Sequence, residues 1–94
     1  MTVEEIKVKI QPILRKYHVI RAGVFGSVVR GEATKDSDVD VLVELPKGAS
    51  LFDLVGIKID CEELLGRKVD VLTYDSIYHL LRDRILKEEV KIEV

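Results

Sequence analysis

Residues 26–45 read GSVVRGEATKDSDVDVLVEL, and this stretch decides the fold. It follows a short β-branched run, residues 19–25, that predicts a strand. Gly26-Ser27 breaks that strand sharply, and Gly31 ends the short helix that Ser27 opens. Residues 38–45 predict a second strand with apolar residues on both faces, as in a strand that is covered on both sides. The stretch therefore predicts a strand, a short helix and a strand in succession.

The segment before this stretch predicts one long helix. Thr2 and Glu5 fit a capping box, in which Thr2 is the N-cap and Glu5 is the third helical residue. Pro12 interrupts the helix and should kink it, because proline has no N–H to donate. The residues of the apolar face recur at helical spacing: Val3, Ile6, Ile10, Ile13, Leu14 and Tyr17.

The segment after this stretch predicts a turn and a second long helix. Residues 46–48, Pro-Lys-Gly, are typical of a turn. Ser50 and Asp53 fit the N-cap and third residue of a helix that runs to about Leu65, with Gly66 just beyond its end. The predicted buried stripe of this helix consists of Leu51, Leu54, Val55, Cys61, Leu64 and Leu65.

The last third of the chain completes the predicted fold. Residues 67–73 predict a third strand, and residues 90–94 alternate like a short edge strand. Asp75 or Ser76 can cap a last helix, whose apolar residues are Ile77, Leu80, Leu81 and Ile85. The order of elements predicts an α/β (α+β) fold, with a small mixed sheet of three to four strands covered by helices. No linker composition interrupts the chain, so we expect one domain over residues 1–94.

Asp38 and Asp40 are the candidate metal ligands. They lie two residues apart on a predicted strand, so both side chains leave the same face, and their Cα atoms should lie about 6.5–7 Å apart. Carboxylates at this spacing can converge on one or two magnesium ions, which prefer hard oxygen ligands. A solvated turn explains Asp36 better than it explains the pair, because Asp40 lies inside an apolar run. A calcium loop fails, since Val41 stands where such a loop needs Gly and Lys47 where it needs Glu.

Gly26-Ser27 is a candidate phosphate-binding turn. Backbone N–H groups exposed between a strand and a helix bind phosphate, and Gly allows a close approach. Ser27 adds a hydroxyl donor, and Arg30 lies one turn further along the same helix face, where it could pair with a phosphate oxygen. An ordinary turn is the alternative, because the stretch contains neither a Walker A loop nor a dinucleotide fingerprint.

Asp70 is a third acid of interest because it lies within the apolar strand predicted at residues 67–73. A carboxylate there is costly unless it is paired or ligated, which independently favours a place in a site. The alternative is a salt bridge with Lys68 or Arg67.

The combination of these features is more specific than its parts. The chain resembles the polymerase-beta-like nucleotidyltransferase superfamily, whose signature matches Gly26-Ser27-x-x-Arg30-Gly31 followed by Ser37-Asp38-x-Asp40 and an apolar strand. In its small size and in the sequence of residues 26–45 the chain resembles the minimal nucleotidyltransferase group, which includes the MntA-type antitoxins. The resemblance covers nearly the whole chain and implies the nucleotidyltransferase fold.

The resemblance also implies a role for each candidate residue. Asp38 and Asp40 would bind Mg²⁺, with two ions expected. Asp70 matches the third carboxylate of the superfamily; it would complete the metal site and could accept the proton of the acceptor hydroxyl. The triphosphate of ATP would be held by Gly26, Ser27 and Arg30.

A reaction and a partner follow from the same resemblance. The chain would transfer AMP from ATP to a hydroxyl, and the resemblance favours a tyrosine of a partner HEPN-domain toxin. It would then be a protein adenylyltransferase that acts as the antitoxin of the pair. Two alternatives stay open: a module that binds the toxin or a nucleotide without catalysis, and a transferase that acts on a small molecule or an RNA end with a partner subunit.

Composition limits the remaining function classes. The formal net charge of −2 argues against a protein that binds nucleic-acid duplexes. Cys61 is the only cysteine, so no intrachain disulfide and no cysteine-based metal site are expected. The start does not resemble a signal peptide and no apolar run is long enough for a membrane span, so we expect a cytoplasmic protein. The absence of Asn, together with a single Gln at position 11, hints at a thermophilic source.

Overall fold

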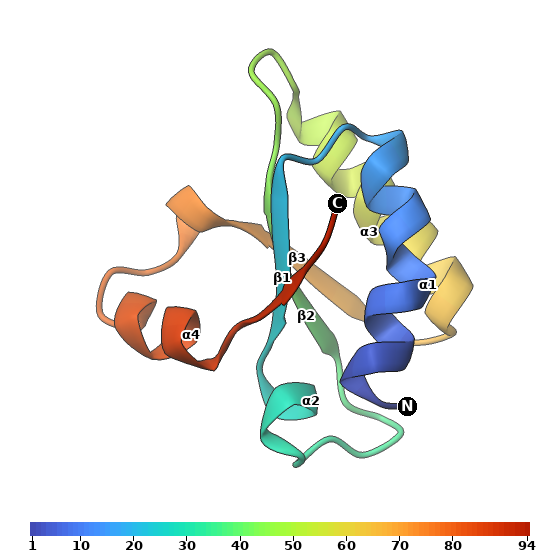
Figure 1. Ribbon diagram of the computed structural model, residues 1–94, viewed down its shortest axis with the longest axis vertical. Helices are drawn as coiled ribbons and strands as arrows, with labels where there is room; N and C mark the ends of the chain where they lie inside the picture. Colours follow the sequence, from blue (N-terminus) through green and yellow to red (C-terminus); the bar gives the residue numbers. More distant parts are fainter.

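The computed structural model describes residues 1–94 and consists of one four-stranded sheet with helices on both sides (Figure 1). In chain order the elements are α1 Val3–Lys16, β1 Arg21–Phe25, α2 Ser27–Arg30, β2 Val39–Glu44, α3 Leu51–Leu65, β3 Val69–Thr73, a 3₁₀ turn η1 Tyr74–Ser76, α4 Arg82–Glu88 and β4 Val90–Ile92. None of the helices has the length and apolar composition that a membrane span requires.

The sheet is mixed, with the strand order β3-β2-β1-β4. β1 pairs antiparallel with both β2 and β4, whereas β2 and β3 are parallel and are joined by α3. The prediction of an α/β (α+β) fold with a small mixed sheet is therefore confirmed, and residues 90–92 form the expected edge strand.

The main core lies between the sheet and the pair of helices α1 and α3, which run side by side over one face (Figure 1). On β2 this face carries Val39, Val41 and Val43, all fully buried. Because side chains alternate along a strand, Asp40 and Leu42 of β2 lie on the opposite face. The facing side chains of the two helices are Ile6, Ile10, Leu14, Ile57, Cys61 and Leu65.

Local capping signals set the starts of the two long helices. The Thr2 hydroxyl accepts a hydrogen bond from the Glu5 N–H at 3.2 Å, as the capping box predicts. At α3 the Ser50 hydroxyl accepts from Phe52, while the Asp53 carboxylate accepts from the Ser50 N–H at 3.1 Å. Pro12 does not end α1, which continues to Lys16.

The predicted buried stripe of α3 is wrong in three places. Leu51, Val55 and Leu64 are respectively 78%, 50% and 48% exposed. The side chains that α3 buries are Ile57, Cys61 and Leu65, which follow one another at a spacing of four residues. Apolar residues occur on several sides of this helix, so spacing alone does not say which line faces the sheet.

The last helix begins later than predicted. Instead of a helix capped at Asp75 or Ser76, the chain makes the short turn η1 and then runs extended at Ile77, and α4 begins at Arg82. The extended backbone lets Ile77 join Tyr74 in a small buried cluster with Phe25 and Leu42 on the second face of the sheet. Burial of these apolar side chains therefore outweighs the capping signal.

Candidate active site

The second face of the sheet carries the candidate site, under α4 (Figure 1). The small cluster of Phe25, Leu42, Tyr74 and Ile77 forms an apolar floor there, and Ile85 of α4 packs against it. Asp40 lies beside this floor, because it is the register partner of Phe25 in the antiparallel pair of β1 and β2.

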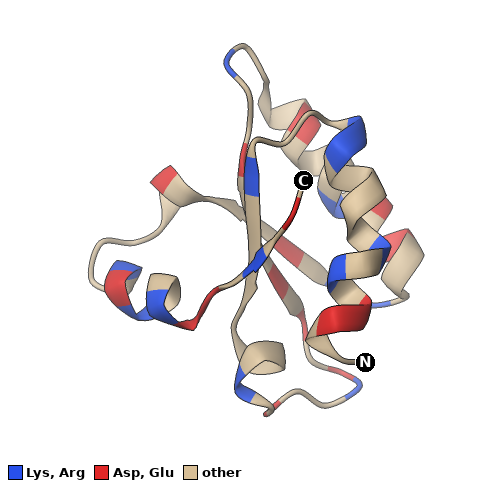
Figure 2. Cartoon of the chain, viewed as in Figure 1, with Lys and Arg blue, Asp and Glu red and all other residues tan.

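The three predicted acids lie together at one end of the sheet. Asp40 and Asp70 are direct register partners in the parallel pair of β2 and β3, and neighbouring strands lie about 4.8 Å apart. Asp38 lies two residues before Asp40. Next to Asp38, the Val39 N–H donates to the Lys68 carbonyl at 2.9 Å, so this part of the chain also lies against the segment that leads into β3. Acidic positions accordingly mark adjacent stretches of β2 and β3 (Figure 2).

Electrostatics also identify Asp40 as the centre of this group. Burial, together with the negative charges of Asp70 and Asp38, raises the pKa of the Asp40 carboxyl to about 6. The Arg30 guanidinium opposes this effect, whereas Glu88 adds to it. An ionised Asp40 at neutral pH therefore lies in a negative environment that a cation would relieve.

The salt bridge offered as the alternative role for Asp70 is not formed. Asp70 forms no ion pair with Lys68 or Arg67, and Arg67 instead donates to the Thr34 carbonyl at 3.5 Å. No group of three or more His, Cys, Asp or Glu side chains is already arranged to hold a metal ion. The three acids lie near one another, but their side chains are not arranged as three ligands of one metal ion.

Gly26 brings the backbone against the Asp40 carboxylate. Its φ of 83° and ψ of −155° belong to a region that essentially only glycine adopts. A Cβ built on Gly26 would collide with Oδ2 of Asp40. The turn between β1 and α2 and the acid on β2 are therefore in direct contact.

Gly26 and Arg30 converge on one anionic group, the carboxylate of Glu88. The Gly26 N–H donates to Oε1 of Glu88 at 2.6 Å, and Nη1 of Arg30 donates to the same oxygen at 2.8 Å. Arg30 also donates to Glu32 at 3.0 Å. Ser27 opens α2, and its hydroxyl has no hydrogen-bond partner within the chain. The structure thus places the three predicted phosphate-binding residues around one turn.

A cavity of about 220 Å³ lies at this turn. Phe25, Gly26, Arg30 and Asp40 line it from the sheet and α2, while the other side is formed by Leu81, Arg84, Ile85 and Glu88. Neither Arg84 nor Glu88 is among the site residues predicted from the sequence. Both lie in a strongly charged segment that is typical of a solvated helix face, so the sequence holds no signal that would have found them.

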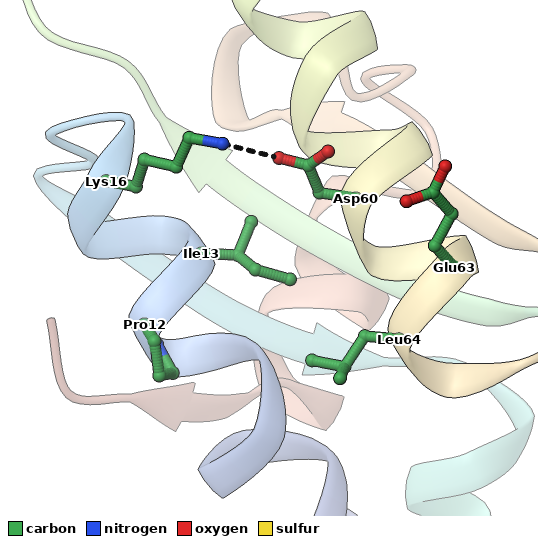
Figure 3. Close-up of a pocket in the computed structure, with 6 residues that line it drawn as sticks. All are labelled: Pro12, Ile13, Lys16, Asp60, Glu63 and Leu64. Carbon is green, nitrogen blue, oxygen red and sulfur yellow. Dashed lines mark hydrogen bonds and ion pairs between the residues drawn. The ribbon is translucent and has the colours of Figure 1, made fainter.

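A larger depression of about 520 Å³ lies between α1 and α3 (Figure 3). Lys16 and Asp60 form an ion pair at 3.3 Å at its edge, and Ile13 and Leu64 contribute apolar surface. It contains none of the predicted site residues and lies on the helical side of the sheet, opposite Asp40. We therefore place the candidate active site at the smaller cavity.

The mixed sheet, with Gly-Ser after β1 and acids near the starts of β2 and β3, agrees with the nucleotidyltransferase fold that the sequence resemblance implied. The chain belongs to the nucleotidyltransferase domain family, which matches residues 7–92. A solved structure of a candidate minimal nucleotidyltransferase is 34% identical, with a TM-score of 0.82 and coverage of 96% of this chain and 95% of that chain. The fold is therefore that of the minimal nucleotidyltransferases.

Relatives place the chain more closely within this family. A candidate protein adenylyltransferase of Methanocaldococcus jannaschii is 55% identical over 92 residues, which cover 98% of this chain and 99% of the relative. Protein adenylyltransferase MntA of Thermococcus cleftensis is 35% identical over 96 residues, covering 98% and 97% respectively. The chain is a transferase of the MntA-like group, and the resemblance inferred from its sequence is confirmed.

Proposed function

We propose that the chain transfers AMP from ATP, in a magnesium-dependent reaction, to a tyrosine hydroxyl of a partner HEPN-domain toxin. The tyrosine oxygen attacks the α-phosphorus, and pyrophosphate leaves as the bond between the α- and β-phosphates breaks. The observation that carries the proposal is the contact between two features of the site: Asp40, which lies beside Asp38 and Asp70, touches the Gly26 turn, where Arg30 also converges. A cluster of carboxylates beside a set of anion donors suits a metal-bound polyphosphate.

The acids fit magnesium by their chemistry. Carboxylate oxygens are the hard ligands that Mg²⁺ prefers, and one or two of them suffice when substrate phosphates supply the rest. In this proposal Asp38 and Asp40 hold the ions, two of them in the full site, and Asp70 completes it. Bound magnesium would neutralise phosphate charge and lower the pKa of the attacking hydroxyl.

The turn residues orient the nucleotide. The Gly26 N–H and the Arg30 guanidinium are donors that already converge on a single oxygen, and the free Ser27 hydroxyl lies beside them. Phosphate oxygens held there would present the α-phosphorus next to Asp40. Positioning and charge neutralisation would then supply most of the rate, and Asp70 could take the proton of the acceptor.

The choice of a toxin as the acceptor rests on the relatives. The curated relatives described above are protein adenylyltransferases. Two solved structures of the same fold, at 20% and 16% identity, are a toxin–antitoxin with AMP-PNP and a tri-AMPylated Shewanella oneidensis HEPN toxin in complex with MNT antitoxin. These facts describe those proteins, and they support a nucleotide substrate and a HEPN partner for this chain.

The test is transfer of label to the partner. The chain is incubated with ATP labelled at the α-phosphate, MgCl₂ and a HEPN-domain protein as the partner. We expect label on a partner tyrosine by mass spectrometry, and no label when magnesium is chelated. An unlabelled partner within an intact complex would support the non-catalytic alternative, and label on small hydroxylated acceptors or RNA ends instead would support the third.

Ser27→Ala should weaken the use of ATP only mildly. The variant removes one neutral hydroxyl that has no partner within the chain, so the fold should be unaffected. Loss of one hydrogen bond of about 1 kcal/mol corresponds to a rise of about fivefold in KM for ATP. Steady-state kinetics at saturating partner measure it, and a loss of transfer as large as that of an aspartate variant would contradict the role.

A further inference from the structure

Glu88 accepts hydrogen bonds from the same two donors that, in the proposed function, bind a phosphate of the nucleotide. One carboxylate oxygen accepts from both the Gly26 N–H and the Arg30 guanidinium, at 2.6 and 2.8 Å. The Glu88 side chain is only 14% exposed and the Arg30 side chain 35%, so the carboxylate itself is largely covered. No phosphate can hold both donors while the carboxylate is there.

We propose that the Glu88 carboxylate competes with a nucleotide phosphate for the Gly26 N–H and the Arg30 guanidinium. The phosphate binds only when Glu88 has released both donors. The inference rests on the proposed function, because it assumes that the same donors receive a phosphate. It assigns a role to Glu88 of α4, which is not among the site residues predicted from the sequence.

The size of the cavity favours this exchange. It measures about 220 Å³ with α4 in place, whereas pockets that hold cofactors and drug-sized ligands measure roughly 300–1,000 Å³. Four of its lining residues belong to α4 or precede it directly, namely Leu81, Arg84, Ile85 and Glu88. A shift of the segment that carries Glu88 would therefore enlarge the space for a nucleotide.

α4 is attached in a way that permits such a shift. None of its residues is buried, and Ile85 is only partly buried against the cluster on the second sheet face. Besides Glu88, its polar attachment is Arg82, which donates to the Tyr74 carbonyl at 2.7 Å. The next residue, Glu89, accepts from the Tyr74 hydroxyl, and β4 then pairs with β1. A change confined to α4 would leave the sheet intact.

A positioning role is the rival explanation. Glu88 could remain in place during the reaction and hold Arg30 in the correct orientation. The two roles predict opposite effects on nucleotide binding: removal of a competitor tightens it, whereas removal of a positioning residue weakens it.

The experiment measures binding of a non-hydrolysable ATP analogue with MgCl₂ by isothermal titration calorimetry. If the Glu88-bound state holds about nine-tenths of the molecules, Glu88→Gln should lower the apparent Kd about tenfold. Glu88→Ala, which leaves no acceptor at all, should lower it at least as much. Asp83→Asn is the matched control, since it also removes one negative charge from α4 but at a position that does not line the cavity, and its Kd should equal that of the wild type.

Hydrogen exchange supplies a readout that a structural role would not move. In the wild-type chain the analogue should speed exchange of the α4 amides while it protects the Gly26 amide. An unchanged or weaker affinity in both Glu88 variants, or protection of α4 by the analogue, would overturn the inference. Failure of the proposed function is distinguishable, because the wild type would then bind the analogue at no concentration, or would bind the analogue and still label no partner when it is given labelled ATP.

Discussion

Asp40→Asn is expected to abolish AMP transfer and at the same time to stabilise the fold. The amide cannot supply the charged oxygen ligands that magnesium requires, so transfer should fall below detection. Its stability should rise because the variant removes a carboxylate from a negative, partly buried environment whose members include Asp70 and Asp38. Asp38→Asn is expected to lose transfer as well.

The pH dependence fixes the sign of the stability effect. The pKa of Asp40 is raised from 3.8 to about 6 in the folded chain, so the folded state binds this proton more tightly than the unfolded state does. Ionised Asp40 therefore costs stability progressively as the pH rises from about 4 to 6, and the full cost is present above that range. After discounting for solvent screening we expect about 1 kcal/mol, or a Tm increase of about 4–8 °C at pH 7.5.

Thermal melts at pH 4 and pH 7.5 check this expectation. The difference between Asp40→Asn and the wild type should be present at pH 7.5 and nearly vanish at pH 4. Asp36→Asn is the matched control, because Asp36 is an exposed acid in the turn before β2 and no pKa-raising effect on Asp40 is attributed to it. Magnesium should raise the Tm of the wild type more than that of Asp40→Asn. Transfer retained by the Asp40 and Asp38 variants would remove both acids from the metal site.

The sequence was most informative where the determinants of structure are local. The step from β1 through Gly26 into α2 depends on neighbouring residues, as does the capping box of Ser50 and Asp53, and all of these formed as predicted. The placement of Asp40 beside Asp70 needed one further inference, that the two apolar strands are neighbours in the sheet. Strand alternation then put both acids on one face.

The sequence was least informative where contacts join distant segments. Glu88 reaches Gly26 across 62 residues, and nothing in a charged run such as Lys87-Glu88-Glu89 distinguishes a glutamate that enters a cavity from one that faces solvent. The start of α4 was misplaced for a related reason. Burial of Ile77 in a cluster with Phe25 is a tertiary effect, and it overrides the local capping signal of Asp75 or Ser76.

Gly26→Ala should damage both the fold and the site. The backbone at Gly26, with φ of 83°, is strained for any residue with a Cβ, at a cost of about 1–3 kcal/mol. The new Cβ would also collide with Oδ2 of Asp40, so the carboxylate has to leave its position. We expect a loss of at least about 2 kcal/mol, or a Tm decrease of about 8–16 °C, and no detectable AMP transfer.

Gly31→Ala separates backbone strain from the collision. Gly31 ends the same short helix with φ of 74°, but a Cβ there meets nothing within 4 Å. This control should therefore lose stability through strain alone and should keep AMP transfer at temperatures where it is folded. If Gly26→Ala matched it in both Tm and transfer, the close approach of Asp40 to the Gly26 backbone would not belong to the reactive arrangement. If only Gly26→Ala lost transfer, the contact between the acid and the turn would be part of the chemistry.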